Sequence, residues 1–383
     1  MWRVDEAVAE QIAIGAGILG TGGGGNPYLG KTQLRRLLRE GAAPPVVVSP
    51  DEVPDDAVVA SVGGMGAPTV GIERLARGDE WTVALRALEA HTGRRVEYLV
   101  PGEIGGANST RPLVCAVQTG LPVIDADGMG RAFPELQMET FSIYGVRCTP
   151  AGLADLKHNS VVFADLADSV TLERYARAVT IQMGGHAGYA FPLMSGAELR
   201  RTAIPGTMTL AREIGAAVER ARRAHQDPVA AVLAVAGGQV LFAGKVVDVE
   251  RRMAAGFARG QVRLDGLGDW RGSAMAIDFQ NENLIARRDD TVAAVVPDLI
   301  CIVDAASAAP VTTEVIRYGL RVAVLGIPAP ALLKTPAALA VVGPRAFGYD
   351  VEYVPLPGEY GAGGDDNHDG AKSAAAHRAP AAG

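Results

Sequence analysis

The feature that most constrains the fold of this chain is an alternation of short apolar runs with amphipathic helical segments over its first 125 residues. Apolar runs of strand length occur at residues 46–48, 57–62, 96–100 and 122–125, and helical periodicity occurs at 5–18, 27–41, 80–91 and 107–119. Strands that are separated by helices pair in parallel, and the helices cover the sheet. The sequence therefore predicts an α/β fold whose N-terminal domain, residues 1–167, has three layers and a mostly parallel sheet.

The pattern changes beyond residue 167. Short strand-like runs occur at residues 169–179, 240–249, 260–264 and 273–279, with one amphipathic helix at 207–223. We expect a β-rich second domain over residues 168–290 that carries this one helix. Residues 291–358 return to a buried-strand pattern and either re-enter the α/β domain or extend the second one. Residues 359–383 consist mainly of Gly, Ala, Asp and His, so we expect a disordered tail.

Charge and cysteine usage exclude several classes of partner. The chain has 43 acidic and 36 basic residues, a net charge of -7, so no global positive field attracts nucleic acid or an anionic membrane. It has no N-terminal signal pattern and no apolar run of about 20 residues. Cys115, Cys148 and Cys301 lie in apolar contexts typical of buried thiols. We expect a cytoplasmic protein that binds a small molecule, and the sequence leaves a homo-oligomer open.

Three loops that follow predicted strands combine glycines with acids. They span residues 63–69, 101–109 and 125–135, and they contain Glu103, Asp125 and Asp127. The loops after parallel strands meet at one edge of the sheet, where α/β proteins bind ligands. Crowded carboxylates favour either a divalent metal or a raised pKa suited to acid–base chemistry. The alternative is that the glycines form tight turns and the acids cap helices.

Two further motifs are candidates for the same site. His186 stands between glycines that expose it, and elimination among the six histidines leaves it as the preferred metal ligand or proton carrier. The run that contains Gly23, Gly24 and Gly25 precedes a predicted helix and either holds an anion or forms a closely packed turn. It lacks the lysine of a phosphate-binding loop, so we expect no nucleotide.

A polar cluster over residues 278–284 contains Asn281 and Asn283 around one aromatic residue. Five amide or acid side chains within seven residues can bind a polar ring or form a polar turn. The cluster by itself does not distinguish the two.

Five segments together resemble the S-methyl thiohydantoin desulfurase family, formerly a family of unknown function described as hydantoinase/oxoprolinase-like. They are residues 19–30, 101–109, 125–135, 280–284 and 296–300, and the resemblance runs from about residue 5 to 357. The resemblance implies an α/β first domain, a β-rich second domain and a substrate with a thiohydantoin or hydantoin-type ring.

The leading hypothesis is a hydrolase that removes sulfur from such a ring with a divalent metal, Zn or Mn, which activates water. Asp125, Asp127 and His186 are the candidate ligands, with Asp127 and His186 also counted as catalytic. Glu103 is the general base or proton shuttle. Substrate-binding roles go to Asn108 and Arg131, which match a ring carbonyl and a carboxylate, and to the glycine run and Asn281 and Asn283.

Two other hypotheses remain. One is hydrolysis of a ring C–N bond in a hydantoin or 5-oxoproline-like amide. The other is a ligand-binding subunit without catalysis. The released product separates the first from desulfurisation, and binding without turnover identifies the second.

Overall fold

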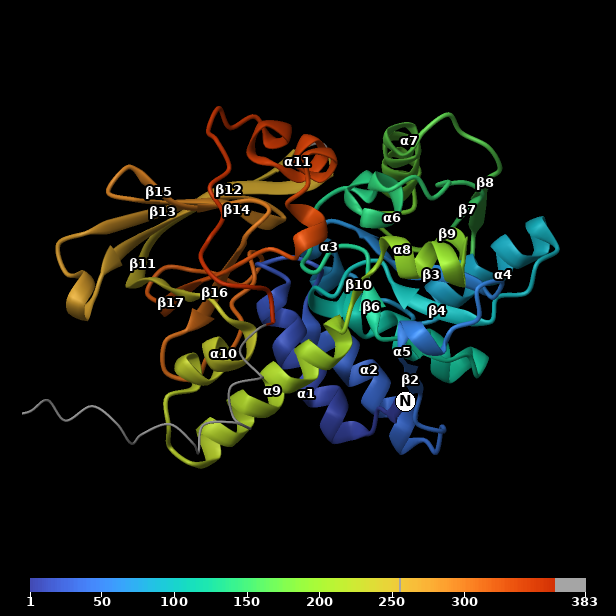
Figure 1. Cartoon of the computed structure of the whole chain (residues 1–383), viewed down its shortest axis with the longest axis horizontal. Coiled ribbons are helices and arrows are strands. Elements are labelled where there is room, and N and C mark those ends of the chain that lie inside the picture. Colours follow the sequence, from blue (N-terminus) through green and yellow to red (C-terminus); the bar gives the residue numbers. More distant parts are fainter. Residues whose placement is uncertain (255, 362–383) are drawn as a thin grey trace, which may run out of the picture.

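Two large β-sheets lie side by side in the computed structural model, which describes residues 1–254 and 256–361 (Figure 1). The first sheet has the strand order β1-β2-β5-β4-β3-β9-β7-β8. Its strands are β1 (Trp2–Arg3), β2 (Val46–Val48), β3 (Val58–Gly66), β4 (Tyr98–Pro101), β5 (Val123–Ile124), β7 (Ala151–Ala154), β8 (Ser160–Phe163) and β9 (His186–Ser195). No helix in the described part of the chain has the length and apolar character needed to cross a membrane.

Helices cover both faces of the first sheet. The helices of the chain are α1 (Glu6–Leu19), α2 (Pro27–Arg39), α3 (Pro68–Glu73), α4 (Glu80–Thr92), α5 (Arg111–Thr119), α6 (Thr140–Ile143), α7 (Ser169–Gln182), α8 (Gly196–Thr202), α9 (Thr207–Arg223), α10 (Pro228–Ala236) and α11 (Pro336–Val342). Alternate residues of one strand point to opposite faces. Val47 accordingly packs into the core formed with α1, α4 and α5, and Val48 packs into the cluster that contains residues of α6 and α8.

The second sheet has seven antiparallel strands in the order β15-β14-β13-β12-β11-β17-β16. They are β11 (Gln239–Ala254), β12 (Phe257–Gly266), β13 (Ala274–Gln280), β14 (Glu282–Arg288), β15 (Thr291–Val295), β16 (Leu299–Asp304) and β17 (Arg321–Ile327). A short ladder joins β6 (Ala126–Asp127) to β10 (Ile204–Pro205). The strands after residue 290 therefore pair within the second sheet. The predicted domain boundaries remain predictions, although β9, beyond residue 167, belongs to the first sheet.

Three expectations from the sequence need correction. The first sheet is mixed, because only β2, β5, β4 and β3 pair in parallel and its other pairs are antiparallel. The predicted strand at residues 169–179 is wrong, because this segment forms α7, capped by the side chain of Asp168. Its buried residues, among them Leu172, Ala176 and Thr180, repeat every four positions, as in a helix. The single helix expected in the second domain is not confirmed, since α7, α8 and α10 accompany α9.

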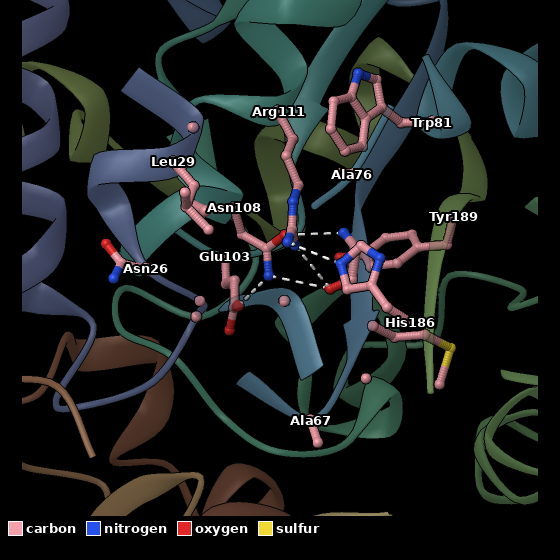
Figure 2. A pocket seen from close by; sticks show the side chains of 18 of the residues that line it. Asn26, Leu29, Ala67, Ala76, Trp81, Glu103, Asn108, Arg111, His186 and Tyr189 are labelled. Atoms are coloured by element: carbon pink, nitrogen blue, oxygen red, sulfur yellow. Dashed lines mark hydrogen bonds between the residues drawn. The ribbon is translucent and has the colours of Figure 1, made fainter. Parts of the chain in front are cut away.

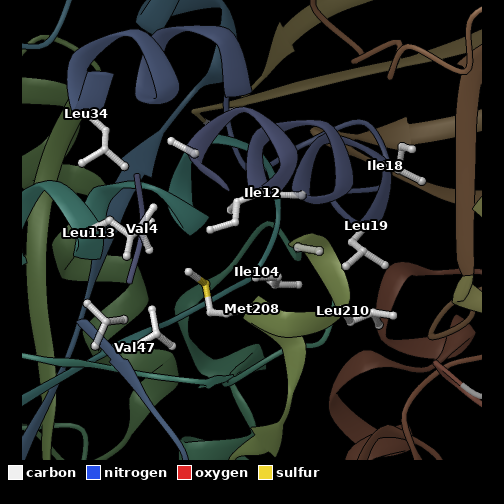
Figure 3. Close-up of a cluster of buried hydrophobic side chains, with 14 of the residues drawn as sticks. Val4, Ile12, Ile18, Leu19, Leu34, Val47, Ile104, Leu113, Met208 and Leu210 are labelled. Atoms are coloured by element: carbon white, nitrogen blue, oxygen red, sulfur yellow. The ribbon is translucent and has the colours of Figure 1, made fainter. Parts of the chain in front are cut away.

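Helices α1 and α9 pack closely and connect the cores of the two sheets (Figures 1 and 3). A Cβ atom built on Gly15 of α1 would lie 1.9 Å from the carbonyl oxygen of Ala211, and one on Gly215 of α9 would lie 1.9 Å from that of Gln11. Each helix thus presents a glycine to the backbone of the other. The same core contains Leu299 and Leu325 of the second sheet. It also contains Ile104, which directly follows Glu103, a residue of the cavity described next.

The predicted tail begins inside the packed structure. Tyr360 is partly buried, and its hydroxyl donates a hydrogen bond to the carbonyl oxygen of Gly130 at 2.7 Å. Residues 362–383 lie outside the described residues.

Candidate active site

A cavity of about 290 Å³ lies at the carboxyl end of the parallel strands, near the junction of the two sheets. It is lined by the end of β3, the loop after β4, the start of β9, the glycine run before α2 and the turn between β13 and β14. Its volume is close to the lower limit of about 300 Å³ for pockets that bind small organic ligands. The cavity is thus suited to a small molecule held by residues of both sheets.

Glu103, in the loop after β4, places a carboxyl group in this cavity. Its side chain is only 6% exposed. One carboxyl oxygen accepts a hydrogen bond from Nδ2 of Asn108, and the other accepts one from the backbone N–H of Phe133 at 3.3 Å. Burial raises the pKa of Glu103 to about 7 in spite of these two bonds. The group therefore exchanges its proton near neutral pH, as a general acid or base requires.

Asn108, Arg111 and His186 form a connected chain of polar groups beside Glu103 (Figure 2). Oδ1 of Asn108 accepts hydrogen bonds from the backbone N–H of Gly64 at 2.8 Å and from the Arg111 guanidinium. The other end of that guanidinium donates to Nε2 of His186 at 3.0 Å. The guanidinium carbon also lies 5.7 Å from the centre of the Trp81 ring. Arg111 therefore places a positive charge beside Asn108 and His186; Arg36, Arg74, Arg77 and Arg177 also line the cavity.

His186 is electrically neutral in this arrangement. Burial and the positive charge of Arg111 lower the pKa of His186 to about 3. Because Nε2 accepts a hydrogen bond from the Arg111 guanidinium, the imidazole carries its own proton on Nδ1. His186 is thus a neutral hydrogen-bond donor at pH 7, which differs from the proton carrier expected from the sequence.

Tyr189 of β9 extends the cavity toward a second buried acid. Its hydroxyl donates to a carboxyl oxygen of Glu139 at 3.3 Å, and burial raises the pKa of both groups well above their usual values. A Cβ atom on Gly102 would lie 2.1 Å from this hydroxyl, and one on Gly63 would lie 2.5 Å from the tyrosine ring. Two glycines of the predicted ligand loops therefore make room for Tyr189.

The structure places Asp125 and Asp127 away from the cavity lining. Asp125 accepts hydrogen bonds from the backbone N–H and hydroxyl of Thr209, in the first turn of α9. Asp127 is fully buried, and one of its oxygens accepts from the backbone N–H groups of Ile104, Met129 and Gly130. Burial raises the pKa of Asp127 to about 7. Both acids organise the loops around the cavity.

The three predicted metal ligands, Asp125, Asp127 and His186, are not brought together. Within residues 1–254 and 256–361, no group of three or more His, Cys, Asp or Glu side chains is placed to hold a metal ion. Asp125 binds the start of α9, Asp127 binds three backbone N–H groups, and His186 binds Arg111. These residues do not fit a shared metal.

Arg131 is fully buried, and its guanidinium donates hydrogen bonds mainly to backbone carbonyl oxygens. Its guanidinium donates to the carbonyl oxygens of Ala132, Pro297, Asp298 and Asn283 and to the hydroxyl of Thr21. It fastens the loop after β6 to the second sheet. The substrate-binding role predicted for Arg131 suits Arg111 better, because Arg111 lines the cavity and Arg131 does not.

The glycine run forms a closely packed turn, which is one of the two structures that the sequence predicted for it. The carbonyl oxygens of Gly24 and Gly25 accept hydrogen bonds from the backbone of Asn108 and Ala107. Gly24 and Gly25 line the cavity, whereas Gly23 does not.

The two asparagines of the polar cluster have different places. Asn281 lines the cavity, and its side chain binds the backbone of Ala258. Asn283 is fully buried and donates to the carbonyl oxygen of Ile300 at 2.9 Å, so it does not reach the cavity lining.

Sequence reasoning missed Arg111, Tyr189 and Glu282 as cavity residues. A signal existed for Arg111, which is the first residue of α5. A cation at a helix N-terminus faces the positive end of the helix dipole, so another interaction has to hold it there. No comparable signal marks Tyr189, because its place depends on the pairing of β9 with β3.

Fold and cavity together define a two-sheet α/β protein with a small-molecule-sized cavity that contains a titratable carboxyl group. Profiles of the S-Me-THD-like N-terminal domain and C-terminal domain match residues 7–165 and 167–356. The chain belongs to this S-methyl thiohydantoin desulfurase-like family.

A crystal structure of a protein from Chromobacterium violaceum, from the Northeast Structural Genomics Consortium, is similar to this fold. It is 25% identical with a TM-score of 0.78, and the match covers 93% of this chain and 100% of that one. The chain matches no protein among those with curated descriptions.

Proposed function

We propose that the protein hydrolytically removes sulfur from a five-membered thiohydantoin-type ring, with Glu103 as the general base. The observation that carries this proposal is the position of Glu103, a buried carboxyl with a pKa of about 7 in a cavity of about 290 Å³. Membership in the S-Me-THD-like family supports the ring substrate. Arg111, His186 and Asn108 supply a cation, a neutral N–H donor and an amide beside this carboxyl.

The proposed reaction starts with a water molecule between Glu103 and the ring. Glu103 removes a proton from the water, the oxygen bonds to the thiocarbonyl carbon, and the electron pair of the C=S double bond moves to sulfur. The Arg111 guanidinium stabilises the negative charge that develops, since a buried cation acts strongly where water is excluded. The hydroxyl proton is then transferred to the sulfur as the carbonyl forms, the carbon–sulfur bond breaks, and its electron pair leaves with the sulfur as hydrosulfide, which takes up the proton held by Glu103.

We assign no step to the divalent metal that the sequence predicts. Its proposed ligands Asp125 and Asp127 direct their oxygens to Thr209 and to backbone N–H groups. Glu103 supplies the activation of water for which the metal was invoked. Zn or Mn as a cofactor remains a prediction that metal analysis tests.

The experiment is an assay of purified protein with a panel of thiohydantoins that detects both sulfide and the organic product. The proposal expects two products in equal amounts, sulfide and the corresponding hydantoin, whose ring stays closed. A ring-opened product without sulfide would overturn it in favour of hydrolysis of a ring C–N bond. Binding of the ring without any product would leave the ligand-binding subunit as the function.

A further inference from the structure

The turn between β13 and β14 places a second acid, Glu282, at the cavity that contains Glu103. The Glu282 side chain is only 3% exposed, and its Oε2 atom has no hydrogen-bond partner among residues 1–254 and 256–361. Glu282 belongs to the second sheet, whereas Glu103 follows a strand of the first. Glu103 and Glu282 thus bring carboxyl groups to the cavity from the two different sheets, and Glu135 also lines it.

The two asparagines on either side of Glu282 hold it in place. Asn281 has a left-handed backbone with φ of +58°, and its Oδ1 accepts from the N–H of Ala258 at 2.9 Å. The backbone N–H of Asn283 donates to the carbonyl oxygen of Thr21 at 2.7 Å, and its Nδ2 donates to that of Ile300. The polar cluster of the sequence therefore fixes a turn whose central acid faces the cavity.

The glycine run accommodates the carboxyl group of Glu282. A Cβ atom on Gly23 would lie 1.9 Å from Oε1 of Glu282, so any side chain at position 23 would occupy the place of that oxygen. The backbone N–H of the adjacent Gly24 forms a hydrogen bond with the same carboxyl group. This loop, which in sequence suggested an anion site, already contains an acid of the chain itself.

The electrostatic environment keeps a proton on Glu282. Burial is the largest cause that raises its pKa well above the usual value, and the neighbouring charge of Glu103 raises it further. The Arg131 cation and the Gly24 N–H act in the opposite direction. Two carboxyl groups in one buried site do not both ionise near neutral pH, because their charges repel. Glu103 titrates near pH 7, and Glu282, whose pKa is raised by burial and by the charge of Glu103, favours the protonated form.

We propose that Glu282 is the general acid of this cavity and delivers a proton to the departing sulfur while Glu103 acts as the base. This inference rests on the proposed function. Glu282 protonates the sulfur, the carbon–sulfur bond breaks, and its electron pair leaves with the sulfur. The hydroxyl proton on the former thiocarbonyl carbon returns to Glu282 as the carbonyl forms. The proton on Glu103 passes to the released hydrosulfide, so both carboxyl groups regain their starting states.

The test compares two substrates with different leaving groups, the S-methyl and S-(4-nitrophenyl) derivatives of one thiohydantoin. In these rings water adds to the same carbon across a C=N bond, the electron pair moves to the ring nitrogen, and a thiolate takes the place of hydrosulfide as the leaving group. Methanethiolate is a strong base and needs a proton to leave, whereas 4-nitrothiophenolate leaves without one. We expect Glu282→Gln to lower kcat/KM at least about 100-fold for the S-methyl compound and less than about 5-fold for the S-(4-nitrophenyl) compound. Glu103→Gln should lose activity on both, because both reactions require activated water.

Glu314→Gln is the matched control, since burial raises the pKa of Glu314 as well, and Glu314 does not line the cavity. It should retain wild-type rates on both substrates. Activity of Glu282→Gln on the S-(4-nitrophenyl) compound shows at the same time that this variant folds.

Equal losses on the two substrates, or no loss on either, would overturn the role of Glu282 and leave the proposed function intact. A wild-type protein that releases no thiol from either substrate and no sulfide from the parent thiohydantoin would overturn both.

Discussion

Replacing Glu103 with glutamine should change how the stability of the protein depends on pH. The pKa of Glu103 rises from the usual 4.5 to about 7 on folding. The folded state therefore binds this proton more tightly than the unfolded state, so the free energy of unfolding falls as pH rises from about 4.5 to about 7. A shift of this size corresponds to about 3 kcal/mol. Glutamine removes this contribution, although its amide N–H₂ meets a donor from Asn108 or Phe133 at a cost of about 1–3 kcal/mol at every pH.

Urea unfolding at pH 4.5 and pH 8.5 gives the change in unfolding free energy between the two pH values, and this change is compared between the wild type and Glu103→Gln. The unfolding free energy of the wild type should fall by about 3 kcal/mol more over this interval than that of Glu103→Gln. Asp168→Asn is the control, because Thr171 lowers the pKa of this exposed acid and the sign of the effect is reversed. Glu103→Gln should also lose about 100-fold to 10,000-fold in kcat/KM. Equal pH dependence in wild type and Glu103→Gln would refute the raised pKa and with it the proposed base.

Four further outcomes follow from the structure. Arg111→Gln should move the rise of kcat/KM with pH to higher pH, because the Arg111 charge lowers the pKa of Glu103, whereas Arg111→Lys should leave its position nearly unchanged. Asp127→Asn should keep kcat/KM within about 5-fold, since an amide oxygen still accepts the three N–H groups, and a loss as large as that of Glu103→Gln would restore Asp127 as catalytic. Dialysis against a chelator should leave activity unchanged, and a loss that Zn or Mn reverses would contradict the mechanism without a metal. Gly15→Ala should destabilise the protein by about 1–3 kcal/mol in urea unfolding, whereas Gly71→Ala, where no atom lies within 4 Å of the added Cβ, should not.

Local sequence patterns identified the four parallel strands of the first sheet, half of its eight strands. The parallel strands β2, β3, β4 and β5 coincide with apolar runs between helices, since buried parallel strands need continuous apolar side chains. The pattern failed at α7, where β-branched residues such as Val170 and Thr171 suggested a strand. Packing against the neighbouring elements outweighs this weak local preference. The antiparallel addition of β9 to β3 joins segments more than 100 residues apart, and no local pattern encodes such a pairing.

The site was predicted in part. Glu103, Asn108 and His186 line one cavity, as expected from glycine-rich loops after parallel strands and a histidine between glycines. Sequence reasoning named Arg131 and did not consider Arg111, because burial and hydrogen-bond partners are properties of the folded chain. Asp127 and Glu103 look alike in sequence, yet one binds backbone N–H groups and the other faces the cavity.

The sequence by itself determined the α/β character of the first half, the loops that surround the cavity and the family resemblance, because these depend on local periodicity and short motifs. Tertiary structure decided which polar groups meet. Glu282 lines the same cavity as Glu103 only because the second sheet packs against the first, and His186 reaches Arg111 only because β9 pairs with β3. Such contacts join residues far apart in the chain, and the pKa of each group follows from the burial and the charges that these contacts create.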